Sequence, residues 1–264
     1  MTRSSRRRFL QAAALAPVAP LVGCGDDVAP PPPPPGETPF GYGIASGDPR
    51  PTSVVLWTHV TSPDNGPVAL TWELSDSPDF ARVVAMGSGV AEPARDFTVH
   101  AVASGLTPGR PWYYRFRALG RVSPVGRTRT APVGRVDRLR VALVSCNNMG
   151  TGWWHVFRRI AARADLDAVL HLGDFIYEYP AGYYGNLRAL DPQGACVRLA
   201  DYRRRYAWYR RDPDLQAMLR QHPLIAVWDD HEFANNAWQA GAENHAADFE
   251  GPWAARAAAA SQAW

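Results

Sequence analysis

The sequence predicts a β-sandwich followed by an α/β unit, and three observations support this prediction. Between residues 40 and 132, short runs of β-branched and aromatic residues alternate with turn formers. From about residue 138, apolar strand-like runs alternate with helical segments. Hydrophobic residues make up 46% of the 264 residues, which is enough apolar surface for more than one core. We therefore expect two folded units behind an N-terminal extension.

The first residues have the pattern of an export signal. A basic region, Arg6–Arg8, precedes a short Ala-rich apolar stretch. The paired arginines resemble a twin-arginine signal, which implies export of a folded protein by the twin-arginine translocation machinery. Residues 21–24 resemble a lipobox, in which Cys24 is lipidated. We expect residues 1–24 to be a twin-arginine lipoprotein signal, with an ordinary signal peptide and an incidental cysteine as the alternative.

This signal predicts an exported protein on the periplasmic or extracellular face, anchored to the membrane by the lipid at Cys24. Residues 25–38 follow as a linker, in which Pro30–Pro35 form an unbroken series. A proline series lacks backbone donors and stays extended, so this segment is expected to act as a tether. No run of 18 apolar residues occurs, and no transmembrane helix is predicted.

The net charge is small. The sequence has 28 basic residues, all of them Arg, and 25 acidic residues, which leaves a formal charge of +3. No nucleic-acid-binding surface is evident from this balance.

Residues 39–133 are expected to form the β-sandwich. Four runs of strand-forming residues are separated by turn sequences such as residues 62–66 and 106–109. The four predicted strands are residues 54–58, 68–73, 98–102 and 112–117. Because this stretch holds no paired acids, histidine cluster or nucleophile, we expect a structural or positioning module.

Residues 134–264 are expected to form the α/β unit. Strands are predicted at residues 139–145, 168–172 and 223–228, and helices at 153–163 and 201–220, with Pro213 restarting the second helix. An Ala-rich helix ends the chain.

A polar cluster follows each of the three strands. The carboxyl ends of strands in an open α/β sheet border a shared crevice, so these clusters are expected to converge. The clusters are Ser145-Cys146-Asn147-Asn148, Gly173-Asp174-Phe175-Ile176-Tyr177 and Asp229-Asp230-His231-Glu232.

The residue types in these clusters can bind metal ions. Cys146, Asp174, Tyr177 and Asp230 offer a thiolate, two carboxylates and a phenolate, a set that suits a trivalent ion beside a second cation. Two neighbouring metals can activate water and neutralise phosphoryl oxygens, and Asp174 is the natural bridging ligand. The pattern thus favours phosphate-ester hydrolysis.

Simpler interpretations exist for several of these residues. Cys146 could form a disulfide with Cys196 in an oxidising compartment. Tyr177 could be a packing aromatic, and His231 a structural histidine. The basic run 203–205 fits a solvated helix face better than a phosphate clamp.

The sequence resembles the PhoD-like alkaline phosphatases, relatives of the purple acid phosphatases among the metallophosphoesterases. The motifs that carry the resemblance are residues 40–49 and 55–58 for the N-terminal β domain, and Ser145-Cys146, Gly173-Asp174 with Tyr177, and Trp228–Glu232 with Asn235-Asn236 for the catalytic domain. The resemblance implies an immunoglobulin- or fibronectin-like β-sandwich followed by an incomplete calcineurin-like α/β metallophosphoesterase domain.

The same resemblance implies site roles. A ferric ion would be held by Cys146, Asp174 and Tyr177, with calcium nearby and other divalent metals as an alternative. Asp230 falls where many metallophosphoesterases place a ligand Asn, and His231 where they place a histidine that assists the leaving group or orients the phosphate. Asn235 is a candidate for the calcium side or the substrate.

Family members continue well beyond the third cluster, so we expect a C-terminally truncated chain that carries only the N-terminal part of the phosphatase domain. The implied activity is that of an alkaline phosphatase or phosphodiesterase on phosphomonoesters or phosphodiesters outside the cytoplasm. The rival hypotheses are a non-catalytic exported lipoprotein fragment and a phosphate-ester-binding module.

Overall fold

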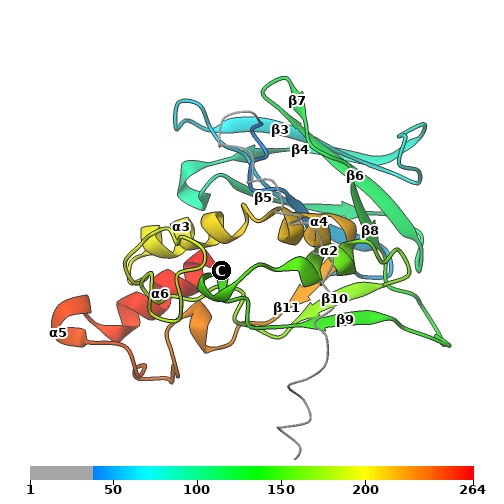
Figure 1. Ribbon diagram of the computed structural model, residues 1–264. Helices are drawn as coiled ribbons and strands as arrows, with labels where there is room; N and C mark the ends of the chain where they lie inside the picture. The colour runs from blue at the N-terminus through cyan, green and yellow to red at the C-terminus, as the bar shows by residue number, and fades with distance from the viewer. Residues whose placement is uncertain (1–37) are drawn as a thin grey trace, which may run out of the picture. The chain divides into compact units, whose positions relative to one another are not determined.

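The computed structural model describes residues 38–264, and the predicted signal, Cys24 and nearly all of the linker lie outside the described residues. The described part forms two β-sheets with helices beside one of them (Figure 1). No helix within it is long and apolar enough to cross a membrane.

The β-sandwich predicted from the sequence is confirmed. One sheet has the order β4-β3-β6-β7, with β8 also paired to β6. Its strands are β3 (Val68–Ser75), β4 (Val83–Ala91), β6 (Pro111–Ala118), β7 (Arg121–Val122) and β8 (Gly126–Arg129). The strands of the facing sheet are β1 (Ile44–Gly47), β2 (Ser53–His59) and β5 (Thr98–Ser104).

The core of the sandwich follows from alternation along these strands. In β3 and β6, every second side chain is buried, which is the two-residue period of a strand with one face on a core. Leu56, Leu74 and Phe116 in this core are fully buried. All four sequence-predicted strands fall inside β2, β3, β5 and β6, whereas β1, β4, β7 and β8 were not predicted.

The three strands predicted for the α/β unit also form. They are β9 (Val141–Val144), β10 (Ala168–His171) and β11 (Pro223–Ala226), and they run parallel. The helices are α2 (His155–Ala161), α3 (Leu199–Tyr209), α4 (Pro213–Gln221), α5 (Ala247–Glu250) and α6 (Trp253–Ala263). The predicted restart is confirmed, because Asp212 caps α4 through Leu215 N–H (2.9 Å) and Pro213 opens it.

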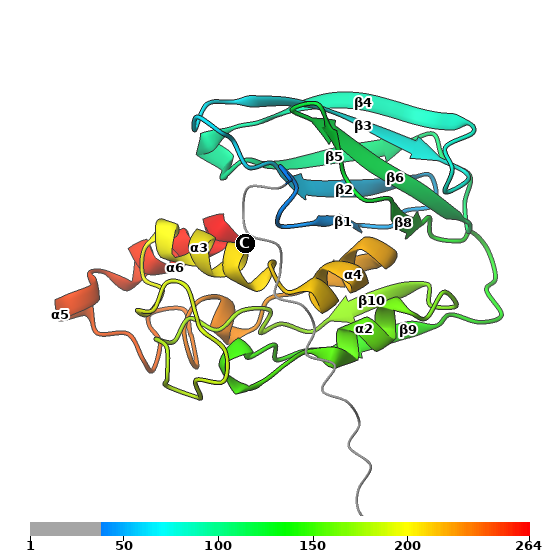
Figure 2. The same ribbon diagram turned by 45° about the horizontal axis from the view of Figure 1, so that its top comes forward.

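One sheet continues from the sandwich into the α/β region. Strand β1 pairs with β2 on one side and with β11 on the other, where Ser46 lies opposite Pro223. The result is a six-stranded mixed sheet in the order β5-β2-β1-β11-β10-β9. Figure 2 shows its strands β5, β2 and β1 one below the other. The α/β strands are therefore held in line with the sandwich by backbone hydrogen bonds.

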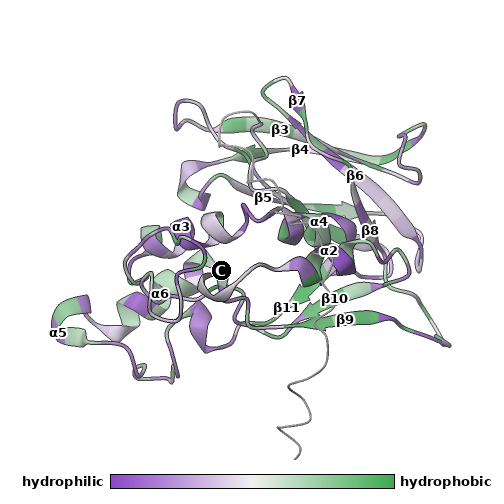
Figure 3. Ribbon diagram, in the orientation of Figure 1, coloured by the Kyte–Doolittle hydropathy of each residue, from purple (hydrophilic) through white to green (hydrophobic). Residues whose placement is uncertain are grey.

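The two faces of β9, β10 and β11 differ. Helices α2, α3, α4 and α6 contribute to a second core on one face, around Val169, Leu215 and Met218. The other face carries Leu143 in register with Leu170 and Ile225, and it is not covered by any described residue. These strands are among the most hydrophobic parts of the ribbon in Figure 3.

Candidate metal centre

The candidate ligands that follow β9 and β10, Cys146 and Asp174, both have a left-handed backbone conformation. Cys146 has φ 61° and Asp174 has φ 54°, a conformation that costs energy for residues with a Cβ. The two loops are joined by hydrogen bonds from Cys146 N–H to Gly173 O (3.2 Å) and from Asn147 N–H to Asp174 O (2.8 Å). Strain of this kind is typical of residues that the surrounding structure positions for a function.

Gly173 allows the loop after β10 to approach the loop after β11. Its φ is +103°, and a Cβ at this position would lie 2.4 Å from the Cβ and 2.5 Å from the backbone N of Asp229. Only glycine fits such a contact. Geometry therefore explains the Gly173-Asp174 motif. Gly173 allows the two loops to approach each other, and Asp174 supplies the carboxylate.

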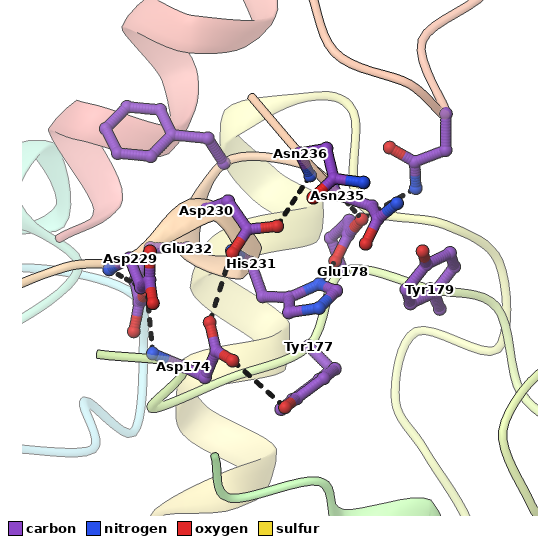
Figure 4. A network of polar contacts seen from close by, with 12 residues as sticks. Asp174, Tyr177, Glu178, Tyr179, Asp229, Asp230, His231, Glu232, Asn235 and Asn236 are labelled. Atoms are coloured by element: carbon purple, nitrogen blue, oxygen red, sulfur yellow. Dashed lines mark hydrogen bonds and ion pairs between the residues drawn. The ribbon is translucent and has the colours of Figure 1, made fainter. Parts of the chain in front are cut away.

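The loops after β10 and β11 bring three metal-binding side chains together. Asp174, Asp230 and His231 each offer a ligand atom, and these atoms all lie within 4.8 Å of one another. Asp174 and His231 are buried and Asp230 is partly exposed. Figure 4 shows Asp174 and Asp230 on the same side of the imidazole. The structure thus brings the second and third polar clusters together, as the sequence predicted.

The carboxylate of Asp174 lies between two groups of candidate ligands. Its Oδ2 accepts a hydrogen bond from the Tyr177 hydroxyl (3.0 Å), whereas Oδ1 faces the backbone N of His231 (3.4 Å). Cys146 is not part of the cluster of three, but it lies near enough to Asp174 and Tyr177 to affect the pKa of both side chains. The Asp174 carboxylate therefore contacts the second cluster through Tyr177 and the third through His231.

His231 is fixed on two sides. Its Nδ1 lies 2.8 Å from Oε2 of Glu178, and its ring stacks on Tyr177 with centroids 4.1 Å apart. Burial disfavours the imidazolium, but the hydrogen bond and charge of Glu178, together with Asp174 and Asp230, raise the pKa of His231 above its ordinary value. Because Nδ1 is engaged by Glu178, Nε2 is the nitrogen available to a ligand.

Two buried glutamates, one in each loop, accept hydrogen bonds from the other loop. Glu178, after β10, accepts hydrogen bonds from the third cluster and its flanks: His231, Asn235 N–H (2.7 Å) and Asn244 (2.6 Å). Glu232, after β11, accepts from Asp174 N–H (3.0 Å), Phe175 N–H and Asp229 N–H (2.8 Å). Both glutamates are fully buried. Each loop therefore supplies the carboxylate that fixes the other.

Sequence reasoning missed Glu178, which lies directly after Tyr177. It included Glu232 in the third cluster but gave this residue no role. The sequence did hold a signal for each. Glu178 lies among aromatic residues and Glu232 at the end of an acidic run, and a carboxylate buried in such a place needs several hydrogen-bond donors.

Burial also affects the ionisation of the candidate ligands. It raises the pKa of Asp174 and of the Tyr177 phenol, and the neighbouring Asp174 charge raises the Tyr177 pKa further. Without a cation the phenol therefore stays protonated. A bound positive ion would favour both anionic forms, which is the usual electrostatic signature of a metal site.

Asn235 lies beside this cluster without belonging to it. Its side-chain Nδ2 donates to Glu243 (3.1 Å), and its backbone N–H donates to Glu178. The predicted role of Asn235 on the calcium side or toward the substrate stays a prediction.

The remaining sequence hypotheses have clear outcomes. Among the described residues, Cys146 and Cys196 are both free thiols, so the alternative disulfide is not formed.

The expectation that residues 203–205 form a solvated face is wrong for Arg205, which is fully buried. Its guanidinium donates to main-chain oxygens, including those of Tyr179 (3.0 Å) and Pro192 (2.7 Å), and so holds the loop after β10.

Comparisons with known proteins agree with this architecture. The family described as PhoD-like phosphatase matches residues 141–264, and the one described as PhoD-like phosphatase, N-terminal domain, matches residues 27–132. Alkaline phosphatase D of Bacillus subtilis (strain 168) is 39% identical over 211 residues, which are 75% of this chain and 36% of that protein.

Solved structures give the same result. A structure of PhoD has a TM-score of 0.79 at 35% identity, covering 85% of this chain and 45% of that one. Purple acid phosphatase PPD1 from yellow lupin (Lupinus luteus) seeds has a TM-score of 0.51 at 13% identity, covering 84% and 40%, which is a likeness of fold alone. The chain spans less than half the length of these relatives, and it belongs to the PhoD-like phosphatase family, with that family's N-terminal domain preceding the phosphatase region.

Proposed function

We propose that this chain takes part in metal-dependent hydrolysis of phosphate esters, as an alkaline phosphatase or phosphodiesterase of the PhoD-like type. The observation that carries the proposal is the cluster of Asp174, Asp230 and His231, whose ligand atoms lie within 4.8 Å of one another. The relative from Bacillus subtilis is an alkaline phosphatase, which supports this reaction class. Phosphomonoesters and phosphodiesters are the proposed substrates.

The donor set fits metal ions of two kinds. Cys146, Tyr177 and Asp174 would hold Fe³⁺, because a thiolate and a phenolate beside a carboxylate suit a highly charged ion of iron. Asp174 and Asp230 would supply carboxylate oxygens to the second ion, for which we propose Ca²⁺. The hydrogen bonds at both oxygens of Asp174 support its role as the shared ligand. Bound ions would supply a water of lowered pKa and charge neutralisation for the phosphoryl oxygens.

The chain's own residues would prepare this reaction. Tyr177 and Cys146 lose protons when they become ligands, so ion binding releases protons. Glu178 holds the imidazole of His231 through Nδ1 and presents Nε2. With its raised pKa, His231 would donate a hydrogen bond to the phosphoryl group or a proton to the leaving oxygen.

We test the function with the purified protein. Its iron and calcium content is measured, together with hydrolysis of p-nitrophenyl phosphate and bis-p-nitrophenyl phosphate. Asp174→Asn is expected to lose bound metal and activity together, because it removes the shared charge. Asp137→Asn makes the same change at a side chain that is 95% exposed and is expected to keep both.

The outcomes separate the rival hypotheses. Metal bound through Asp174 without turnover would indicate a phosphate-ester-binding module and contradict hydrolysis by this chain. Full metal content and activity in Asp174→Asn would contradict the assignment of Asp174 to a metal centre.

We further propose that the protein is exported by the twin-arginine translocation machinery and anchored by a lipid at Cys24, outside the cytoplasm. The paired arginines before the Ala-rich stretch and the cysteine at its end support this proposal. Cys24→Ser is expected to move the protein from the membrane fraction to the soluble fraction. Replacement of Arg7 and Arg8 by Lys is expected to retain it inside the cell. Unchanged fractionation of both variants would contradict the proposal.

A further inference from the structure

A cavity of about 500 Å³ lies beside β2 and α3. Residues from β2, the loop before β5, α3, β11 and the end of α6 line it. The five predicted metal-binding residues and His231 are absent from its lining. Its volume is in the range of small-molecule sites. The side chains that matter for the inference are Trp57, His59, Phe175, Tyr206 and Arg210.

Arg210 brings a partly buried positive charge to this cavity. Its Nη1 is buried and has no hydrogen-bond partner among residues 38–264, and no acidic side chain of those residues forms an ion pair with it. The guanidinium stacks on Trp57, with its central carbon 3.6 Å from the ring centroid. Burial lowers the pKa of Arg210 to about 10, so the group is still a cation at neutral pH. A partly buried cation without an ion-pair partner favours an anion beside it.

Two neutral side chains, Tyr206 and His59, line the same cavity. Burial raises the pKa of Tyr206 and lowers that of His59 to about 4, so both are neutral at pH 7. The Tyr206 hydroxyl and Nδ1 of His59 have almost no accessible surface, so these side chains contribute neutral walls beside Arg210 rather than donors to a ligand.

The other charges around the cavity are mainly positive. Arg95 and Arg203 line it together with a single carboxylate, Asp96, while burial and the neighbouring Arg210 lower the pKa of His100 and keep that ring neutral. Arg203 donates to the main-chain oxygen of Ala94 (2.8 Å). Burial raises the pKa of Asp96, which the charge of Arg203 offsets in part. The balance favours an anion over a cation.

The walls are aromatic. Arg210 stacks on Trp57, and the rings of Phe175 and Tyr206 lie 6.3 Å apart and are tilted by 31°. Trp264 approaches Tyr206 from α6, with centroids 6.3 Å apart. Such walls contact flat apolar groups well.

We propose that this cavity binds a small organic anion that has a carboxylate or phosphate-like group attached to an aromatic body. The anionic oxygens would accept hydrogen bonds from the guanidinium of Arg210, and the flat body would lie against the aromatic walls. The site is separate from the candidate metal centre and does not depend on the proposed hydrolysis.

The test uses calorimetric titration of the purified chain with four probes. Benzoate and benzylphosphonate combine a ring with an anionic group, benzyl alcohol lacks the charge, and inorganic phosphate lacks the ring. We expect saturable binding of at least one aromatic anion, and at least tenfold weaker binding of the alcohol and of phosphate. The absence of saturable binding of both aromatic anions, or equal binding of the alcohol, would overturn the proposal.

Variants locate the binding. Arg210→Met keeps an apolar side chain over Trp57 and is expected to weaken binding at least tenfold. Arg159→Met removes the same charge from an exposed position of α2 and is expected to bind as the original protein does. Asp174→Asn is expected to leave affinity unchanged. Loss of binding in Asp174→Asn, or its retention in Arg210→Met, would refute the site.

The empty protein provides a second measurement. Because the charge of Arg210 has no partner, Arg210→Met without ligand is expected to melt at a higher temperature than the original chain, and ligand is expected to raise the Tm of the original chain only. A lower Tm of the empty variant together with unchanged affinity would show that Arg210 acts in packing, and would overturn the proposal.

Discussion

Nδ1 of His231 lies 2.8 Å from Oε2 of Glu178, and the Glu178 side chain is completely buried. The pair joins the loop after β10 to the loop after β11. Glu178 also accepts hydrogen bonds from Asn235 N–H and Asn244, so its two oxygens serve three donors. A buried carboxylate is stable only with such partners. The position and tautomer of the His231 ring therefore depend on a residue outside the cluster of candidate ligands.

Glu178→Gln is expected to weaken both the fold and the site. The amide has one acceptor oxygen and a donor NH₂ group, so it cannot satisfy three donors and leaves at least one buried partner unmatched. The free energy of unfolding, measured by urea denaturation, should fall by about 1–3 kcal/mol. Any phosphatase activity should fall by about 10–100-fold, as for other residues that orient a functional histidine.

Glu243→Gln is the control for this change, since Glu243 is exposed and contacts the side chains of Asn235 and Asn236. Its stability should stay within about 0.5 kcal/mol of the original protein. Equal effects of the two substitutions would contradict the role given to Glu178.

Gly173→Ala is expected to separate the two loops of the metal centre. The added Cβ would meet Asp229 at 2.4–2.5 Å, and φ at this position is +103°. Gly182→Ala isolates the backbone contribution, because Gly182 has φ +85° with nothing within 4 Å of the added atom. We expect a loss of about 1–2 kcal/mol for Gly182→Ala and about 1–3 kcal/mol more for Gly173→Ala. Equal unfolding free energies for the two variants would show that the loops are not in close contact.

The strands of the sandwich could be predicted because their patterns are local. Residues 54–58 and 112–117 are rich in β-branched or aromatic residues and lie between turn formers. Strand β4 lacked this signal, since Val83–Ala91 includes two glycines, a serine and an exposed Met86. The pairing of β1 with β11 could not be predicted, because the residues of neither strand indicate which distant segment, nearly 180 residues away, will pair with it.

The candidate site was predictable where it depends on strand ends. Asp174, Asp230 and His231 follow parallel strands, and such ends meet at one edge of a sheet. Glu178 and the role of Glu232 could not be found in this way, because buried glutamates are rare and both residues accept hydrogen bonds from groups of another loop. Local sequence does not show which loops will touch.

The stability of the protein is expected to fall in mild acid. His171 is buried in β10, with Nδ1 accepting from Gly173 N–H (3.3 Å), and burial lowers its pKa from 6.5 to about 4. The unfolded chain binds a proton near pH 6.5 and the folded chain only near pH 4, so stability is complete above pH 6.5 and is lost as the pH falls toward 4. The loss from this residue is roughly 3 kcal/mol.

His171→Gln is expected to reduce this pH dependence, as measured by urea denaturation at several pH values between 4 and 7. His59, with a pKa of about 4, acts in the same direction and should leave part of the slope. His155→Gln, at a half-exposed histidine, is the control. A slope that is the same in His171→Gln and the original chain would contradict a neutral buried His171.

Tyr177→Phe tests the proposed iron ligand by absorption spectroscopy. A phenolate bound to Fe³⁺ gives a visible charge-transfer band, whereas the Tyr177 phenol donates a hydrogen bond to Asp174 in the protein without metal. The iron-loaded original chain should be coloured, and Tyr177→Phe should lose the band that depends on the phenolate. Tyr183→Phe, at a tyrosine that is 61% exposed, should keep it. The same band in Tyr177→Phe would exclude Tyr177 as the ligand.

The uncovered face of β9–β11 is expected to bind the hydrophobic dye ANS. Leu143 is 62% exposed and Val227 is 54% exposed, on a face that the described residues leave open. The double variant Leu143→Lys, Val227→Lys should therefore lower ANS fluorescence, because charges interrupt the apolar patch. It should change the free energy of unfolding by less than about 0.5 kcal/mol for each residue. Met86→Lys, at a 70% exposed residue of β4, should leave the fluorescence unchanged. A loss of several kcal/mol in the double variant, with no ANS binding by the original chain, would instead show that this face is buried in the native protein.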